Sequence, residues 1–226
     1  MPENNMTWIA FGDIHQSNGL PARIPEIKNA DAIIVTGDLT NHSPEGAVEK
    51  VWDSIYTFNP RILAQAGNMD RSNVTEFLKE KNANLHCEVR ELAPGIKIMG
   101  VGCSIPTPFG TPSEVTEEEM ASLLEETHSL AGDYEKLILA VHDSPHGTSL
   151  DKISNGMHVG SRSVRSFIEK YQPEIVVSGH IHESSGEDVL GKSRIFNPGM
   201  AAEGGYVLIT LENGNLDAVL KQAGSS

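Results

Sequence analysis

Three short hydrophobic segments in the first third of the chain end in the same way, with a glycine followed by a polar residue that can bind metal. They end in Phe11-Gly12-Asp13, Thr36-Gly37-Asp38 and Ala66-Gly67-Asn68. In a parallel α/β sheet the carboxyl ends of the strands share one edge, so we expect these polar side chains to converge there. A glycine before each of them allows a sharp turn and a close approach to a bound group. This repeated ending restricts the chain to an α/β fold with a site at the strand ends.

Two later hydrophobic segments end in histidine. One ends in Val141-His142, and the other continues into Gly179-His180-Ile181-His182. The pairs Asp13 with His15 and His180 with His182 are spaced two residues apart, so both members of a pair lie on one side of an extended backbone. The five strand ends together supply seven candidate metal ligands, which are Asp13, His15, Asp38, Asn68, His142, His180 and His182.

The ligand types indicate which metals the site would accept. The set contains imidazoles, carboxylates and an amide but no thiolate. Mixed nitrogen and oxygen ligation favours Mn, Fe, Co, Ni or Zn over Ca, and the lack of cysteine argues against a structural zinc site. The sequence therefore predicts two divalent metal ions of this group.

Hydrophobic periodicity predicts how these segments are arranged. One helix is expected at 117–130, with a capping box from Thr116 to Glu119, and a second begins near Ser161 or Ser163 and ends before Pro173. An α/β first half followed by a β-rich, antiparallel ending predicts two packed sheets covered by helices on the outside. The expected strands are 8–11, 32–36, 62–66, 96–101, 137–141, 175–177, 194–197, 206–211 and 216–221.

Composition restricts the partners. The chain has 226 residues and a formal net charge of −14, so we expect one domain spanning 1–226 that repels nucleic acid and anionic membranes. The sequence has no recognisable secretory signal and no hydrophobic run near the roughly 18 residues of a membrane span, which predicts a cytoplasmic protein. Cys87 and Cys103 lack CxxC spacing, and we expect both to be buried and reduced.

The motifs DxH, GD, GNxD, an isolated His and GHxH, in this order over residues 13–182, resemble the calcineurin-like metallophosphoesterase family. The resemblance is to its bacterial and archaeal branch related to cyclic-nucleotide phosphodiesterases, which has GNxD in place of GNH. It implies a four-layer α/β/β/α sandwich of two mixed sheets flanked by helices. One metal would be held by Asp13, His15 and His182, and a second by Asn68, His142 and His180, with Asp38 bridging both.

The same resemblance implies the reaction. A metal-bridging hydroxide would attack phosphorus in line, hydrolysing a phosphodiester or an activated monoester. The partner would be a small-molecule phosphate ester or a nucleotide, and a homodimer remains open. The alternative is a protein-binding scaffold of the same fold, as in the retromer subunit that has lost metal-ligand histidines. All seven ligand positions are filled here, which favours catalysis.

Met69 departs from the family pattern, because many members have histidine at this position and methionine cannot transfer a proton. Either another histidine takes this role or the leaving group needs little protonation. We expect Asp38 and Asn68 to take part in catalysis, with His146 and His158 as substitute proton donors and His42 as a weaker candidate.

Three other segments near the strand ends have open roles. Ser161 and Arg162 open a helix whose backbone N–H groups could bind substrate phosphate, although an ordinary capped helix fits equally well. Asp70 could orient a metal ligand or start the helix ahead of Ser72. The proline-rich stretch 105–112 is expected to be an ordered loop, with a lid as the alternative.

Overall fold

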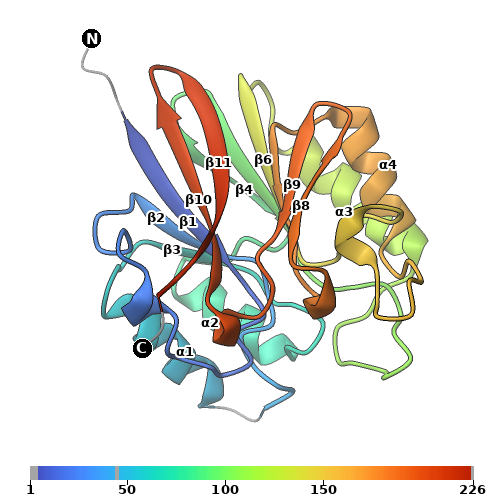
Figure 1. Ribbon diagram of the computed structural model, residues 1–226, viewed down its shortest axis with the longest axis horizontal. Helices are drawn as coiled ribbons and strands as arrows, with labels where there is room; N and C mark the ends of the chain where they lie inside the picture. Colours follow the sequence, from blue (N-terminus) through green and yellow to red (C-terminus); the bar gives the residue numbers. More distant parts are fainter. Residues whose placement is uncertain (1–4, 44–45, 225–226) are drawn as a thin grey trace.

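The computed structural model describes residues 5–43 and 46–224, which form two β-sheets with α-helices on their outer faces (Figure 1). The first sheet has the order β11-β10-β1-β2-β3 and the second the order β4-β5-β6-β7-β9-β8. The strands of the first sheet are β1 (Met6–Phe11), β2 (Ala32–Val35), β3 (Ile62–Ala64), β10 (Gly205–Glu212) and β11 (Asn215–Gln222). Those of the second are β4 (Glu88–Ala93), β5 (Ile96–Val101), β6 (Lys136–Val141), β7 (Ile175–Val177), β8 (Gly186–Leu190) and β9 (Ser193–Asn197).

The predicted convergence of strand ends is confirmed, because β1, β2 and β3 run parallel to one another, as do β5, β6 and β7. The expected antiparallel ending is confirmed for β10 and β11, which form a hairpin. For β9 it is confirmed on one side only, because β9 pairs antiparallel with β8 but parallel with β7. The reason is β8, a charged strand that periodicity did not reveal. It lies between β7 and β9 in the sequence and runs antiparallel to β9, so β9 runs in the same direction as β7.

Three hydrophobic cores separate the layers. Along β1, Trp8 and Ala10 face the core between the sheets, whereas Ile9 and Phe11 face the helices. This alternation is expected of a strand that is buried on both faces. On the outer faces, α1 (Ala47–Tyr56) and α2 (Ser72–Glu80) cover the first sheet, and α3 (Glu117–Ser129) and α4 (Arg162–Tyr171) cover the second. The predicted four-layer sandwich is therefore confirmed.

The helices show why bounds could be predicted for α3 and α4 but none for α1 and only a possible start, near Ser72, for α2. The predicted capping box of α3 is present, since Thr116 Oγ1 accepts from the Glu119 amide and Glu119 caps the Thr116 amide. Ser161 caps the start of α4, which ends at Tyr171 and has Gln172 as its C-cap ahead of Pro173. By contrast, α1 and α2 follow Gly46 and Arg71 and have no side-chain cap. They lack the local signal that marks a helix start.

Gln65 joins the two sheets at the strand ends. Its buried Nε2 lies 3.2 Å from each of three backbone carbonyl oxygens, those of Thr36 in the first sheet region and of Val101 and Ala140 in the second. Buried carbonyl groups need hydrogen-bond partners. One amide therefore serves carbonyl groups of both sheets next to the site.

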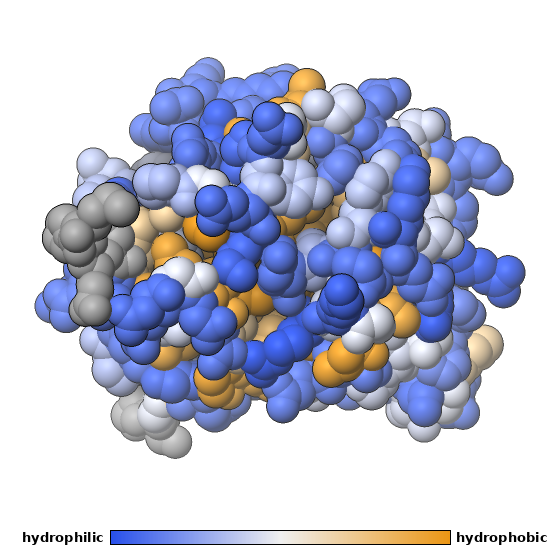
Figure 2. All heavy atoms as spheres, turned by 90° about the horizontal axis from the view of Figure 1, so that it is seen from above, coloured by the Kyte–Doolittle hydropathy of each residue, from blue (hydrophilic) through white to orange (hydrophobic). Residues whose placement is uncertain are grey.

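The face of the molecule that Figure 2 shows is mostly hydrophilic. Figure 2 views the upper end of Figure 1, where β1 begins, and hydrophobic side chains gather in the hollowed middle of this face. None of the helices in the described residues is both long and hydrophobic enough to cross a membrane. Cys87 and Cys103 are free, as expected, but both are half-buried rather than buried.

Candidate metal centre

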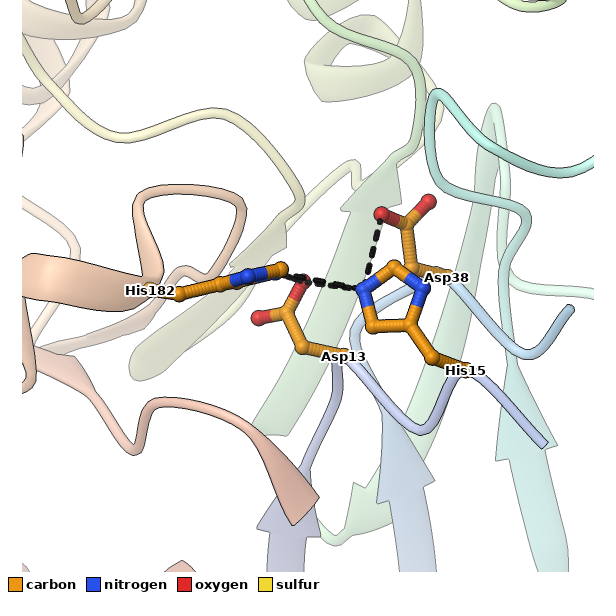
Figure 3. Close-up of side chains that lie close together, drawn as sticks. All are labelled: Asp13, His15, Asp38 and His182. Atoms are coloured by element: carbon orange, nitrogen blue, oxygen red, sulfur yellow. Dashed lines mark hydrogen bonds and ion pairs between the residues drawn. The ribbon is translucent and has the colours of Figure 1, made fainter. Parts of the chain in front are cut away.

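Four predicted ligands from three separate segments meet at one point. A carboxylate oxygen or ring nitrogen from each of Asp13, His15, Asp38 and His182 lies within 4.8 Å of those of the others, and Figure 3 shows the four side chains pointing toward one another. His182 Nε2 lies 3.1 Å from Asp13 Oδ1 and 3.2 Å from His15 Nε2. Two facing ring nitrogens can share at most one proton, so a cation between them fits this donor set.

Asn41 fixes the orientation of His15 and was missed by the sequence analysis. His15 Nδ1 donates to Asn41 Oδ1 at 2.7 Å, and Asn41 Nδ2 donates back to the His15 carbonyl at 3.0 Å. Because the amide oxygen can only accept, the proton of neutral His15 is assigned to Nδ1. The Nε2 lone pair then faces the other ligands, as a metal-binding histidine requires. Its position just beyond Asp38 was the available signal.

The other three predicted ligands form a second group beside the first. His142 Nε2 lies 2.8 Å from Asn68 Oδ1, and its ring centroid is 5.3 Å from that of His180. Asp38 connects the two groups, because its Oδ2 lies 3.4 Å from His142 Nε2 and 3.6 Å from His15 Nε2. The structure thus brings all seven candidate ligands to one edge of the sandwich.

Glycines permit this crowding. A Cβ on Gly67 would lie 2.2 Å from Asp38 Oδ1, and one on Gly179 would lie 2.5 Å from Asp13 Oδ2. Neither distance is tolerable for a carbon atom, so each glycine leaves room for a ligand from another strand end. Several ligand residues themselves adopt left-handed backbone conformations that cost about 1–3 kcal/mol each. The φ angles are 48° for Asp13, 47° for His15, 52° for Asp38 and 68° for His180.

Asp70 braces the loop that carries Asp38. Its buried carboxylate accepts hydrogen bonds from the amides of Leu39, Thr40 and Gly67 at 2.7–3.0 Å. Burial, with a further contribution from the charge of Asp38, raises the pKa of Asp70 to about 6. Asp70 does not cap α2, so of its two expected roles the structure supports the orientation of a ligand segment.

Asp38 and His142 stabilise each other's charged forms. Burial alone would raise the pKa of Asp38, but the neighbouring His142 charge and then His15 lower it to about 2. Burial alone would lower the pKa of His142, but the Asp38 carboxylate raises it to about 9. Burial and the charge of His142 lower the pKa of His180 to about 4. At neutral pH the metal-free centre therefore holds a buried Asp38–His142 ion pair beside a neutral His180.

A pocket of about 710 Å³ opens beside this centre. Its lining includes five of the candidate ligands together with Met69, His42 and the loop 105–112. His42 lies next to Met69, since the His42 amide donates to the Met69 carbonyl at 2.9 Å. Of the three histidines considered as proton donors, His42 is the one that lines this pocket.

The structure places His146 and His158 elsewhere. They flank the buried carboxylate of Asp151, with His158 Nδ1 2.6 Å from its Oδ1 and His146 Nδ1 3.6 Å from its Oδ2. The Asp151 carboxylate also accepts from backbone amides, including that of Gly160. Neither histidine is among the residues that line the pocket. Their contacts are those of groups that brace the segment between β6 and α4.

The start of α4 already has an anionic partner. The Glu117 carboxylate accepts hydrogen bonds from the Ser161 hydroxyl and from the amides of Arg162 and Ser163 at 2.7–3.0 Å. This is the helix terminus at which substrate phosphate was expected. Neither Ser161 nor Arg162 lines the pocket. The structure thus favours the capped-helix alternative, with a carboxylate of α3 in the position expected for phosphate.

Because the Asp38 carboxylate raises the pKa of His142 to about 9, we expect metal binding at this residue to release a proton. We therefore expect Mn²⁺ affinity to rise from pH 6.5 toward pH 8.5, by up to about tenfold per unit for one proton. Calorimetric titration in two buffers of different ionisation enthalpy measures the release. His128→Asn, which alters a histidine of α3, should leave it unchanged; metal binding without proton release would contradict the assignment of His142.

Comparison with known proteins agrees with this geometry. The family model for calcineurin-like phosphoesterases matches residues 6–184. An uncharacterised protein of Methanocaldococcus jannaschii is 33% identical over 201 residues, covering 85% of this chain and 88% of its own.

Two solved structures share the fold at low sequence identity. A protein of Thermus thermophilus has a TM-score of 0.68 at 19% identity, covering 95% of this chain and 98% of its own. A dimetal phosphatase from Danio rerio has a TM-score of 0.60 at 10% identity, with coverages of 97% and 99%. The family match spans most of the chain and contains all seven candidate ligands. The protein belongs to the calcineurin-like phosphoesterase family.

Proposed function

We propose that the protein is a phosphoesterase that needs two divalent metal ions of the group Mn, Fe, Co, Ni and Zn and hydrolyses phosphodiesters or activated monoesters. The observation that carries the proposal is the position of Asp38 Oδ2 between His15 and His142. One carboxylate oxygen within 3.6 Å of both ligand groups is the arrangement a shared ligand requires. Family membership and the dimetal phosphatase of the same fold support hydrolysis of phosphate esters.

Each proposed ion would have its own ligands in addition to Asp38. The first group is Asp13, His15 and His182, and the second is Asn68, His142 and His180. When bound, two divalent ions supply a nucleophile at neutral pH and offset the charge of the phosphoryl oxygens. The chain holds its ligands in place beforehand, through Asn41 on His15 and Asp70 on the loop of Asp38. The Asp70 contact gives the aspartate of this chain's GNxD sequence a physical role.

We further propose His42 as the proton donor to the leaving group. Hydrolysis forms a P–O bond from water and breaks the P–O bond to the leaving group, whose oxygen then needs a proton. Among the pocket-lining residues that are not proposed ligands, His42 and Glu183 carry titratable side chains. His42 is the one that lies beside Met69, on the ligand side of the pocket.

Asp38→Asn should lower metal content and hydrolysis together, because both ion sites lose a charged ligand. We expect bound Mn²⁺ to fall well below two per chain. We expect kcat/KM for an aryl phosphodiester to fall by more than about 100-fold, because removing a group that only supports a metal ligand already costs up to about 100-fold. Metal analysis and a chromogenic assay measure the two effects. The exposed Asp133→Asn serves as control. Full metal occupancy in Asp38→Asn would reject the shared ligand, and a metal-free, inactive wild type would support the scaffold alternative.

His42→Asn should affect substrates according to their leaving group. For leaving groups of high pKa we expect kcat/KM to fall by about 100-fold, the lower range for general acid catalysis. For 4-nitrophenolate, which leaves without a proton, the loss should be much smaller. A series of aryl and alkyl phosphodiesters gives the dependence of rate on leaving-group pKa. His146→Asn is the comparison. If the rate became more dependent on leaving-group pKa in His146→Asn but not in His42→Asn, the proton donor would be His146.

A further inference from the structure

Two chemically different groups of residues line the pocket beside the candidate metal centre. One group is the proposed ligands, including His15, Asp38 and His182. The other is hydrophobic and comes mainly from two segments far apart in sequence, and the volume of about 710 Å³ is enough for a small organic molecule. These two segments contribute Ile105, Pro106, Pro108, Phe109 and Pro112 in one and Ile153 and Val159 in the other, while Met69 and Ile181 lie next to ligands in the sequence.

The wall formed by the proline-rich loop 105–112 is anchored at both ends. At its start, the Ile105 amide donates to Asp143 Oδ2 at 2.9 Å. Just beyond its end, Ser113 donates through its amide to the Asn68 carbonyl at 3.0 Å and through its hydroxyl to the Asp70 carbonyl at 2.6 Å. Prolines restrict the backbone between these anchors. The hydrophobic wall is therefore held at a fixed position relative to the ligands, as an ordered loop rather than a lid.

The charge of the pocket favours one class of ester. Among the described residues that line it, none is lysine or arginine, and Glu183 adds a negative group. A phosphomonoester presents three charged terminal oxygens, whereas a diester presents two, which two metal ions can hold. The described lining offers no lysine or arginine to bind a third oxygen, and protonated His42 is assigned to the leaving group. The lining does offer hydrophobic surface to a second ester substituent.

We propose that this pocket selects phosphodiesters bearing an apolar substituent, which packs between the proline-rich loop and the side chains of Ile153 and Val159. This inference rests on the proposed function and specifies its substrate class. Phe109 is 86% exposed without a substrate. A bulky substituent gives this ring a partner, and aromatic side chains contribute large contact areas.

Three esters with one leaving group test the proposal. They are bis(4-nitrophenyl) phosphate, methyl 4-nitrophenyl phosphate and 4-nitrophenyl phosphate, assayed with the Mn²⁺-loaded full chain. We expect kcat/KM to be highest for the bis-aryl diester and lowest for the monoester. Phe109→Ser should lower the ratio of kcat/KM between the bis-aryl and methyl diesters by about tenfold, mainly through KM, as loss of hydrophobic contact implies.

The matched control is Leu130→Ser, which removes another exposed hydrophobic side chain, 64% exposed at the end of α3. It should leave the ratio unchanged. Two results would overturn the substrate class while leaving the proposed function intact. One is a wild type whose kcat/KM for the monoester equals that for the diesters, and the other is a ratio that Phe109→Ser does not change. A metal-loaded wild type that hydrolyses none of the three would overturn the proposed function itself.

The direction of the hydrogen bonds through Thr111 carries a second, independent inference. Thr111 Oγ1 donates its single proton to Glu114 Oε1 at 2.6 Å. A hydroxyl that has used its proton can only accept from other groups. Asn68 must therefore turn its Nδ2 toward Thr111, which it does at 2.9 Å, and its Oδ1 points away, toward His142.

Glu114 sets this polarity because it accepts from several donors at once. Its Oε1 accepts from the Thr107 hydroxyl at 2.6 Å and from the Thr111 amide at 2.8 Å. Burial would raise the pKa of Glu114, but these hydrogen bonds lower it to about 2. The carboxylate therefore stays ionised and never donates a proton to Thr111 at neutral pH. We infer that Thr111 and Glu114 are positioning residues that hold the Asn68 amide oxygen toward the second ion site.

Thr111→Val removes the hydroxyl that orients Asn68. It should weaken Mn²⁺ binding at one of the two sites by about tenfold or more, the usual effect of losing a group that orients a ligand. Thr111→Ser, which keeps the hydroxyl, should restore binding. Calorimetric titration with Mn²⁺ measures both sites without any assay of activity.

Thr107→Val is the matched control, since it removes an equally short bond to the same Glu114 oxygen without touching Asn68. Equal losses for Thr107→Val and Thr111→Val would show that the loop matters only as a whole and would overturn the positioning role. Unaltered binding in Thr111→Val would overturn it as well. A wild type with no two-site binding would instead reject the proposed function.

Discussion

One buried carboxylate connects the parts of the candidate centre. Asp38 follows β2 in the first sheet, yet its Oδ2 lies 3.4 Å from His142, which follows β6 in the second. Its carbonyl accepts from the amides of Ile14 and His15, and its Oδ1 accepts from the Met69 amide. The loops after β1, β2 and β3 are thus all attached to one residue. The distance between the sheets sets the geometry of the site, so the hydrophobic core and the centre cannot be varied independently.

The loop 105–112 lies outside this rigid frame although it is tied to it. The anchor just beyond its end uses backbone carbonyl groups of Asn68 and Asp70, and hydrophobic side chains of the loop line the pocket. Hydrogen bonds to backbone groups place few demands on the intervening residues. Apart from Thr111, which accepts a hydrogen bond from the Asn68 side chain, residues in the loop can therefore change the contacts offered to a substrate without moving the ligands. Such separation of a fixed scaffold from a variable wall is common where loops carry specificity.

Local patterns predicted much of the fold and the seven candidate ligands, because each ligand follows a hydrophobic strand and most follow a glycine. Long-range partners could not be predicted in the same way. Asn41 and Asp70 act through contacts that only the folded chain creates. The occupation of the α4 terminus by Glu117 depends on how α3 and α4 pack. The helix α1 escaped notice, and α2 was anticipated only as a possible start near Ser72, because both begin without side-chain caps.

Asp13 and His182 touch although 169 positions separate them in the chain. A nascent chain cannot assemble the first ligand group until synthesis has passed His182, whereas the loops after β1 and β2 are made early. An ion shared by these two residues would also close a covalent loop of the chain that spans the 169 positions between them. By restricting the unfolded chain in this way, it would act as a removable counterpart of a long-range disulfide.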